Sequence, residues 1–259
     1  VLLDNDQQKL KTYGEISREL ARRLDPDLTF EVTSDARAAL TGVDYIITTI
    51  RAGGDAGRLF DEQTCLAHGV LGQETTGAGG FAMAIRSVPT LVYYCTLARE
   101  VANPGHLIFN FTNPSGIITQ ALRSKGFDNV YGICDAPSGF IKQLEEILEI
   151  PYGTLDIECY GLNHLSWFRN AKVNGRDVQR ELLDNPRTYE HSEMRLFTRE
   201  MARISGDCML NEYLYFYYRR VKSLSMIQKA DHPRGEMIYL INRELEEQLA
   251  RLELPRDFE

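Results

Sequence analysis

The chain has 259 residues, of which 43% are hydrophobic and 25% charged, and its formal net charge is −8. This apolar fraction supplies a core for one large α/β domain or two smaller ones, and the excess of acids disfavours nucleic acid or an anionic membrane surface as a partner. The sequence shows no leader and no stretch approaching the ~20 apolar residues that span a bilayer, so we expect no membrane insertion and a cytoplasmic location.

Short apolar runs and amphipathic segments alternate from the first residue. The opening run ends on acids, and the sequence then predicts helix 7–24, strand 29–33, helix 34–40 and strand 43–50. The last of these, "VDYIITTI", is apolar throughout, which is typical of a strand covered on both faces. This order of elements predicts a doubly wound parallel sheet.

The alternation continues to about residue 150 and then changes. It predicts helix 82–102, strand 106–111, a helix beginning within 113–126, strand 129–133 and helix 138–150. From residue 151 the sequence favours extended strands with an Asn-Gly hairpin turn at 174–175, and then mostly helical residues rich in Tyr and Arg. We therefore predict two domains, 1–150 and 151–259.

Polar loops follow four of the predicted strands, where open parallel sheets bind their ligands. These loops are "DND" (4–6), "RAGGDAG" (51–57), "FTNPSG" (111–116) and "CDAPSG" (134–139). Ordinary turn chemistry explains any one of them, but it explains Arg51, Asn113 and Cys134 poorly as a set. Asp4 and Asp6 end a strand after which a dinucleotide-binding fold places an acid for the ribose hydroxyls, although acids also commonly begin helices.

The glycine-rich phosphate loop of such a fold precedes that acid by about twenty residues. The sequence starts at Val1, so we expect a fragment that lacks the first strand and this loop. A second glycine-rich segment, "ETTGAGG" at 74–80, has no P-loop lysine. We interpret it as a loop that covers a cofactor or substrate with its backbone.

Five cysteines at irregular spacing make a disulfide framework improbable and leave at least one free thiol. Cys134 is a small buried apolar residue in one interpretation and a metal ligand in another, and Asp135 is a helix cap or an acid. His164 is a core histidine or a second ligand, since a thiolate and an imidazole suit a divalent ion with open positions for substrate oxygens. The tyrosines of 211–220 form a packed aromatic stripe if they carry no chemistry.

Six segments in order carry a resemblance to a known family. They are "IRAGG", "GQETTGAGGFAMAIR", "NFTNPSGIITQAL", "GICDAP", "GLNHLSW" and "NEYLYFYY". Together they resemble glycoside hydrolase family 4, the NAD- and divalent-metal-dependent 6-phospho-glycosidases. The resemblance implies a Rossmann-type domain over 1–150 and a mixed α/β catalytic domain over 151–259. This chain departs from the family in lacking the N-terminal Gly-rich strand and loop and in stopping short of the family's C-terminal part.

The resemblance also implies roles for individual residues. Cys134 and His164 would hold the metal, Mn²⁺, and Asp135 would protonate the leaving oxygen. The base would be Tyr213, with Tyr217 as the fallback. NAD would contact Asp4, Asn5 and Glu74. The substrate would contact Arg51 through its 6-phosphate and also Asn113 and Arg86.

The implied reaction is hydrolysis of a 6-phospho-glucoside such as maltose 6-phosphate. NAD oxidises C3 of the sugar, a base removes the C2 proton, the aglycone leaves, water adds and C3 is reduced again; this family is an exception to the two-carboxylate mechanism. Asp after the Cys indicates the 6-phospho-α-glucosidase subgroup, although Ala136 departs from the Met expected there.

Three alternatives stay open beside this reaction. They are a 6-phospho-β-glucosidase, an NAD dehydrogenase of the 2-hydroxy-acid type, and a non-catalytic nucleotide-binding module. For the assembly, we expect a homodimer or homotetramer.

Overall fold

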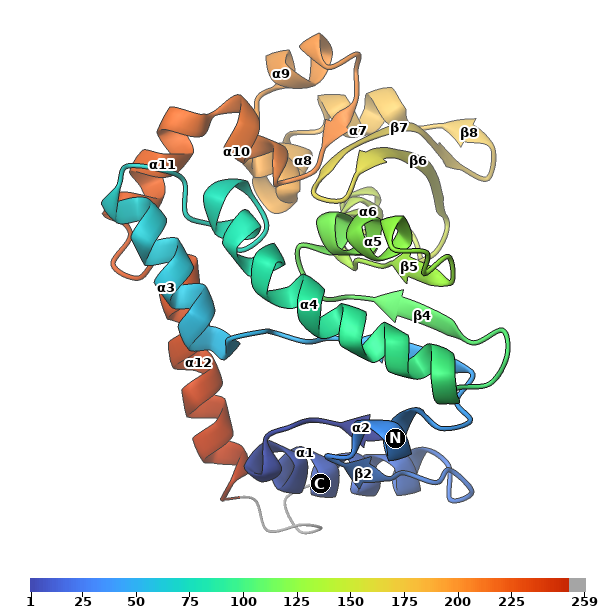
Figure 1. The fold of residues 1–259 in the computed structure, drawn as a ribbon. Coiled ribbons are helices and arrows are strands. Elements are labelled where there is room, and N and C mark those ends of the chain that lie inside the picture. Colours follow the sequence, from blue (N-terminus) through green and yellow to red (C-terminus); the bar gives the residue numbers. More distant parts are fainter. Residues whose placement is uncertain (252–259) are drawn as a thin grey trace.

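A parallel sheet of three strands lies near the middle of the computed structural model, which describes residues 1–251 (Figure 1). The strands are β3 (Tyr45–Thr48), β4 (Leu107–Asn110) and β5 (Val130–Gly132), paired in that order. A separate parallel pair consists of β1 (Leu2–Leu3) and β2 (Val32–Thr33). The predicted parallel α/β arrangement is therefore confirmed, although the strands are short.

Helices connect these strands, and local capping explains where the first ones begin. They are α1 (Gln7–Leu24), α2 (Ala36–Leu40), α3 (Gly54–Ala67), α4 (Gly77–Val101), α5 (Ser115–Ser124) and α6 (Ala136–Leu148). The Asp6 carboxylate accepts the first free N–H groups of α1, and Asp35 does the same for α2. Helix α3 was not predicted, because its first turn lies in the glycine-rich segment that we assigned to a loop.

The prediction that strand 43–50 is covered on both faces is wrong. Tyr45 and Ile47 are 71% and 67% exposed, whereas Ile46 packs with Ile108 against α4 and α5. Both helices lie on one face of the sheet, so within residues 1–251 the other face of β3 has no cover. Within the same residues, β3 pairs only with β4, and its second edge is open.

Helix α4 corrects a second expectation. By length and composition it is long and apolar enough to cross a membrane, contrary to our prediction that no segment approaches that length. Its apolar character has a packing explanation here, since Leu91, Cys95 and Ala98 are buried in the core beside the parallel sheet. Arg86, within the same helix, is ion-paired with Asp61 of α3.

The second half of the chain is built around an antiparallel sheet. Its strands are β6 (Leu155–Leu162), β7 (Leu165–Val173), β8 (Arg176–Asp177) and β9 (Met209–Leu210), with β7 paired to the other three. The predicted hairpin turn is confirmed: Asn174 and Gly175, between β7 and β8, have φ angles of 51° and 80°. The structure thus has the extended strands that the sequence predicted after residue 151.

The remaining elements surround this sheet. They are α7 (Gln179–Asp184), α8 (Pro186–His191), the 3₁₀ helix η1 (Glu193–Leu196), α9 (Arg199–Ile204), α10 (Leu214–Tyr218), α11 (Arg220–Lys229) and α12 (Arg234–Leu249). Phe140 of α6 packs edge-on against Phe168 of β7, with ring centroids 4.9 Å apart, so α6 belongs to the core of the second half. The division at residue 150 stays a prediction.

Helix α12 returns to the first half and packs on α3 (Figure 1). The Glu62 carboxylate of α3 accepts a hydrogen bond of 2.8 Å from the Gly235 N–H group at the start of α12. Farther along, Asn242 donates to Asp55 over 2.6 Å. The Glu62 carboxylate accepts a free N–H group at the N-terminus of α12, where the helix dipole also favours a negative charge. Polar contacts thus hold α3 and α12 together at two points.

We predict that Phe168→Ala lowers the free energy of unfolding by about 3–5 kcal/mol, because it leaves a cavity against Phe140 in a fully buried site. Equilibrium unfolding in urea measures the change. The control is Ile204→Ala, since Ile204 is 86% exposed and its loss is expected to cost less than about 0.5 kcal/mol. Equal losses in the two variants would contradict the assignment of the core.

Candidate functional site

Cys134 and His164 are brought together by two turns that are far apart in the sequence. Cys134 follows β5, and His164 lies in the tight turn between β6 and β7 with a φ angle of 58°. A left-handed backbone is unusual for a residue other than glycine, and such residues are found preferentially at functional sites. The Cys134 Sγ and His164 Nε2 atoms lie 3.6 Å apart.

The protonation of His164 follows from its neighbours. Thr75 donates its hydroxyl hydrogen to Gln73 Oε1 over 2.8 Å, so its oxygen accepts from His164 Nδ1, 3.0 Å away. Nε2 is then unprotonated and faces the Cys134 sulfur. Burial lowers the pKa of His164 to about 4, against the opposing charge of Asp135, so the ring is neutral at pH 7.

Tyr213 completes this cluster. Its ring stacks on His164 with centroids 3.7 Å apart and an interplanar angle of 7°. Burial, followed by the charge of Glu212, raises the pKa of Tyr213 to about 12, and Arg234 acts in the opposite direction. A tyrosine that serves as a base next to a cation would need a lowered pKa, whereas the protein groups by themselves raise it.

Asp135 occupies the N-cap position of α6, yet its side chain makes no capping hydrogen bond. The missing bond removes the helix-cap interpretation of the side chain, and the exposed carboxylate is available beside Cys134. Asn113 is half-buried in the loop after β4. Gly116 of that loop lies against the turn of His164, since a Cβ atom at Gly116 would be 3.7 Å from the Asn163 Cβ.

The segment 74–80 differs from the predicted covering loop, because its last four residues form the first turn of α4. Gly79 and Gly80 allow a close approach: a Cβ atom would lie 2.6 Å from the backbone of Gln73 and of Thr75, respectively. The glycines therefore let the backbone around Thr75 pack on α4. This contact positions Thr75, which the sequence analysis did not single out, against His164.

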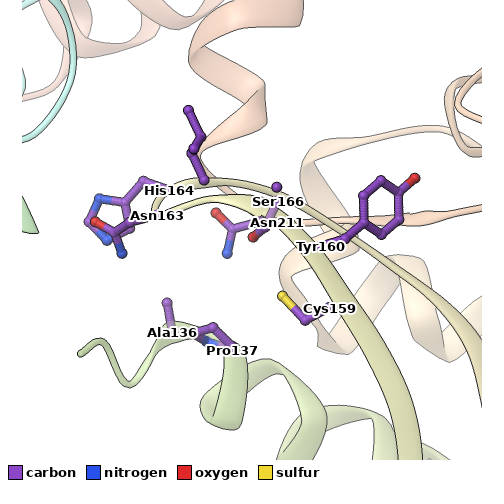
Figure 2. A pocket seen from close by; sticks show the side chains of 10 residues that line it. Ala136, Pro137, Cys159, Tyr160, Asn163, His164, Ser166 and Asn211 are labelled. Atoms are coloured by element: carbon purple, nitrogen blue, oxygen red, sulfur yellow. The ribbon is translucent and has the colours of Figure 1, made fainter. Parts of the chain in front are cut away.

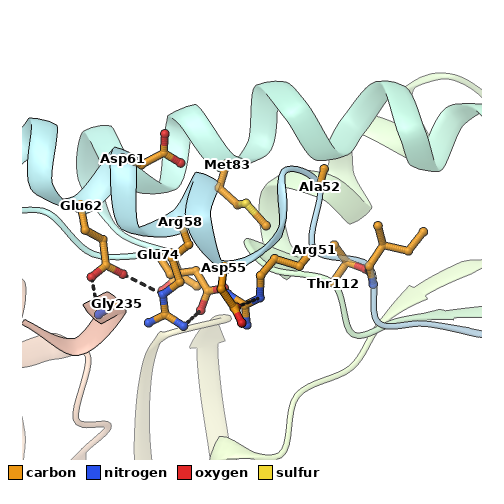
Figure 3. Close-up of polar contacts among 12 residues, drawn as sticks. Arg51, Ala52, Asp55, Arg58, Asp61, Glu62, Glu74, Met83, Thr112 and Gly235 are labelled. Carbon is orange, nitrogen blue, oxygen red and sulfur yellow. Dashed lines mark hydrogen bonds and ion pairs between the residues drawn. The ribbon is translucent and has the colours of Figure 1, made fainter. Parts of the chain in front are cut away.

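Arg51 and Glu74, which we assigned to substrate and cofactor, form one ion-pair network (Figure 3). Arg51 Nη1 pairs with Glu74, and its Nε lies 3.1 Å from Asp55. Arg58 joins the other Glu74 oxygen at 3.1 Å. Arg86 is engaged as well, because both of its terminal nitrogens bond to the Asp61 carboxylate and its Nε donates to the Ala52 carbonyl over 3.2 Å. The predicted ligand roles of these groups stay predictions.

Asp4 and Asn5 lie at the end of β1, in the two-stranded sheet. Asp4 accepts from the Asp6 N–H group over 2.9 Å, and Asp6 caps α1. The structure thus uses Asp6 for the helix and places Asp4 and Asn5 in front of it, as expected for an acid that follows a strand. Their contact with NAD stays a prediction.

A cavity of about 160 Å³ adjoins His164 (Figure 2). It lies between the first residues of α6 and the hairpin formed by β6 and β7. Its lining residues include Asn163, Ser166, Asn211 and the thiol-bearing Cys159. No motif indicated this cavity, because its lining comes from segments up to 75 residues apart, from Ala136 to Asn211.

Cys134 and His164 fit a divalent metal ion. A sulfur and an unprotonated imidazole nitrogen 3.6 Å apart can both reach one ion at the usual ~2.3 Å and ~2.1 Å. Within residues 1–251, no group of three or more His, Cys, Asp and Glu side chains is arranged to hold a metal. The pair therefore offers two protein ligands and leaves positions open for substrate oxygens.

The chain is similar in sequence and structure to several known proteins. A 6-phospho-beta-glucosidase of Thermotoga maritima, BglT, is 29% identical over 99% of this chain and 61% of its own length. A structure of the Thermotoga maritima enzyme with manganese, NAD⁺ and glucose-6-phosphate has a TM-score of 0.84 at 31% identity, and the match covers 98% of this chain and 60% of that one. A 6-phospho-alpha-glucosidase from gut microorganisms, in complex with NAD and glucose-6-phosphate, has a TM-score of 0.85 at 28% identity over 96% of this chain and 58% of that one.

More distant structures share the fold alone. A lactate dehydrogenase of Eimeria maxima has a TM-score of 0.55 at 14% identity and covers 86% of this chain and 66% of its own. This chain spans about 60% of the length of the first two curated relatives that it matches, at 61% and 57%. The profile of the family described as "Family 4 glycosyl hydrolase" matches residues 1–150, and that of its C-terminal domain matches residues 159–257. Because the first profile covers more than half of the sequence, the chain belongs to glycosyl hydrolase family 4.

Proposed function

We propose that the protein, at its full natural length, hydrolyses 6-phospho-glucosides with the help of NAD and a divalent metal, Mn²⁺. The cluster of Cys134, His164 and Tyr213 carries this proposal, because it joins two metal donors and a proton acceptor at one point. Relatives solved with NAD, manganese and glucose-6-phosphate support the choice of cofactors and substrate class. When bound, NAD supplies reversible oxidation of the sugar and the metal polarises its oxygens.

In our proposal, four side chains of this chain bind the metal or transfer protons. His164, neutral at pH 7, offers Nε2 to the metal beside Cys134. Tyr213 takes the C2 proton through its phenol oxygen, and it needs added positive charge to do so because its pKa is raised to about 12. Asp135 donates a proton to the departing glycosidic oxygen, a role supported by its uncommitted carboxylate.

Arg51 is the group we propose for the 6-phosphate, since a guanidinium binds phosphate through two hydrogen bonds. Its pairing with Asp55 and Glu74 fixes its position in advance. Asn113 and Arg86 are proposed to contact the sugar, and Asp4, Asn5 and Glu74 to contact NAD. The assembly as a homodimer or homotetramer and the cytoplasmic location stay predictions.

We propose 6-phospho-α-glucosides as the substrates, because an Asp after the Cys, here Asp135, resembles the 6-phospho-α-glucosidase subgroup. Enzymes of both anomeric classes are among the relatives, so 6-phospho-β-glucosides are the alternative substrates. The protein at full natural length is incubated with nitrophenyl 6-phospho-α- and 6-phospho-β-glucosides, NAD⁺, Mn²⁺ and a reductant. We expect nitrophenol from the α-anomer with no net NADH. Net NADH from a 2-hydroxy acid without nitrophenol would indicate a dehydrogenase, and binding without turnover a non-catalytic module.

Tyr213→Phe is expected to stop exchange of the substrate C2 proton with deuterated solvent. Turnover should fall by about 10²–10⁴-fold, the usual contribution of a general base, while NAD and Mn²⁺ binding persist. Mass spectrometry of the recovered sugar measures the exchange. Tyr217→Phe is the control, because Tyr217 is 51% exposed on α10. If only Tyr217→Phe stopped the exchange, Tyr217 would be the base. Normal exchange in both variants would mean that both tyrosines serve only in packing.

Cys134→Ser is expected to weaken Mn²⁺ binding by about tenfold or more, because the thiolate is one of only two proposed protein ligands. Equilibrium dialysis with metal analysis gives the affinity. Cys159→Ser is the matched control: this exposed cysteine lines the neighbouring cavity without facing His164 Nε2. Retention of full affinity by Cys134→Ser would remove Cys134 from the metal site.

A further inference from the structure

Glu193, the first residue of η1, is a buried carboxylate that the proposed reaction does not use. Its side chain is 6% exposed, and within residues 1–251 it forms no salt bridge. Burying a carboxylate without a cation is costly. Burial raises the pKa of Glu193 to about 7, although a backbone hydrogen bond from Glu212 acts in the opposite direction. A group placed at such cost calls for a structural explanation.

Both hydrogen bonds of its carboxylate lead to the residues just before Tyr213. Glu193 Oε2 accepts from Asn211 Nδ2 over 3.2 Å and from the Glu212 N–H group over 2.9 Å. The Asn211 Oδ1 atom accepts in turn from the Tyr213 N–H group over 3.1 Å. Both ends of the Asn211 amide are thereby engaged, so its orientation is fixed, and the backbone of Tyr213 is fixed with it.

The same group connects the other elements of the site. The Asn211 N–H group donates to the Ser166 carbonyl over 3.2 Å, in the strand that begins directly after His164. The Glu193 N–H group donates to Gln143 Oε1 over 2.9 Å, on the helix that follows Cys134 and Asp135. Glu193 therefore lies where the segments carrying Tyr213, His164 and Asp135 meet.

We infer that Glu193 is a positioning residue that holds the Tyr213 ring parallel to His164, so that the phenol oxygen reaches the C2 proton. The inference rests on the proposed role of Tyr213 as base. Within residues 1–251, the hydrogen bonds of Glu193 do not reach the proposed metal donors; it acts through Asn211 and the backbone of Glu212. A carboxylate serves this purpose because one oxygen accepts two hydrogen bonds, which a side chain with only carbon atoms cannot do.

The stack itself provides a readout that does not depend on activity. A Tyr ring 3.7 Å above an imidazole shifts the signals of that imidazole upfield. Proton–carbon NMR spectra of the full-length protein labelled at His ring carbons show the shift, and His164→Asn assigns the signal. The C2 exchange rate, KM and Mn²⁺ affinity are measured on the same variants.

Glu193→Ala is expected to move the His164 signal toward its ordinary position and to lower the exchange rate by about 10–100-fold, the cost of a base displaced by about 1 Å. KM and Mn²⁺ affinity should change less than about twofold, because the His164 ring keeps its contact with Thr75 and Arg51 keeps its own ion pairs. Glu193→Gln keeps an acceptor oxygen for both donors and should retain the signal and the rate. If the Ala variant fails to fold, Glu193→Asp, which withdraws the acceptor by one methylene, should show the same losses in part.

Glu145 offers a matched control. It is a second buried carboxylate, 2% exposed, and one oxygen accepts two backbone N–H groups, from Thr154 over 2.8 Å and Leu155 over 3.0 Å. Glu145→Ala should destabilise the fold similarly and leave the His164 signal in place. Glu212→Gln removes a charge near Tyr213 while keeping the backbone hydrogen bond, and should also leave the signal unchanged.

Two results would overturn the inference. One is a Glu193→Ala protein whose His164 signal and exchange rate match those of Glu145→Ala; the other is a Glu193→Gln protein as impaired as Glu193→Ala. Failure of the proposed function looks different. In that case the wild-type protein shows no C2 exchange, while the His164 signal still responds to Glu193→Ala.

Discussion

The contact between the imidazole of His164 and the ring of Tyr213 is the constraint on which the geometry of the site depends. A stack of 3.7 Å at 7° tolerates little displacement of either ring, so the hairpin of β6 and β7 and the start of α10 have to be placed together. Thr75 contacts one nitrogen of the His164 ring, Nδ1, and Cys134 lies next to the other, Nε2. Segments from residue 75 to residue 213 thus meet at the His164 side chain, and together they fix its position and orientation.

The parts of the fold that were predictable are those with a local physical cause. Asp6 and Asp35 accept the first N–H groups of α1 and α2, and Asn174-Gly175 supplies two left-handed residues for a tight turn. The exposure of Ile47 was not predictable in this way. An apolar run indicates a strand that is suited to burial on both faces, but whether something covers each face depends on the packing of distant helices.

The same distinction applies to the site. Cys134, His164 and Tyr213 stand in motifs whose order resembles the family, and the structure brings the three together. Thr75 and Glu193 were missed, since a hydroxyl and a carboxylate are unremarkable in sequence and gain their meaning from a partner elsewhere in the chain. The pairing of Arg51 with Glu74 was missed for a similar reason: two opposite charges 23 positions apart carry no sign that they will meet.

Strand β3 has a consequence for the behaviour of the chain in solution. Among residues 1–251, one edge of this strand has unpaired N–H and C=O groups, and its uncovered face bears exposed Ile47 and Tyr45, whose ring stacks with Phe109 at 6.5 Å. An apolar strand with a free edge is a template on which another chain can add a strand. We therefore expect this chain, handled alone at high concentration, to associate through this surface. Measurements of its mass in solution would then combine association through the β3 edge with any native oligomer. A charged substitution at Ile47 should abolish the first and leave the second.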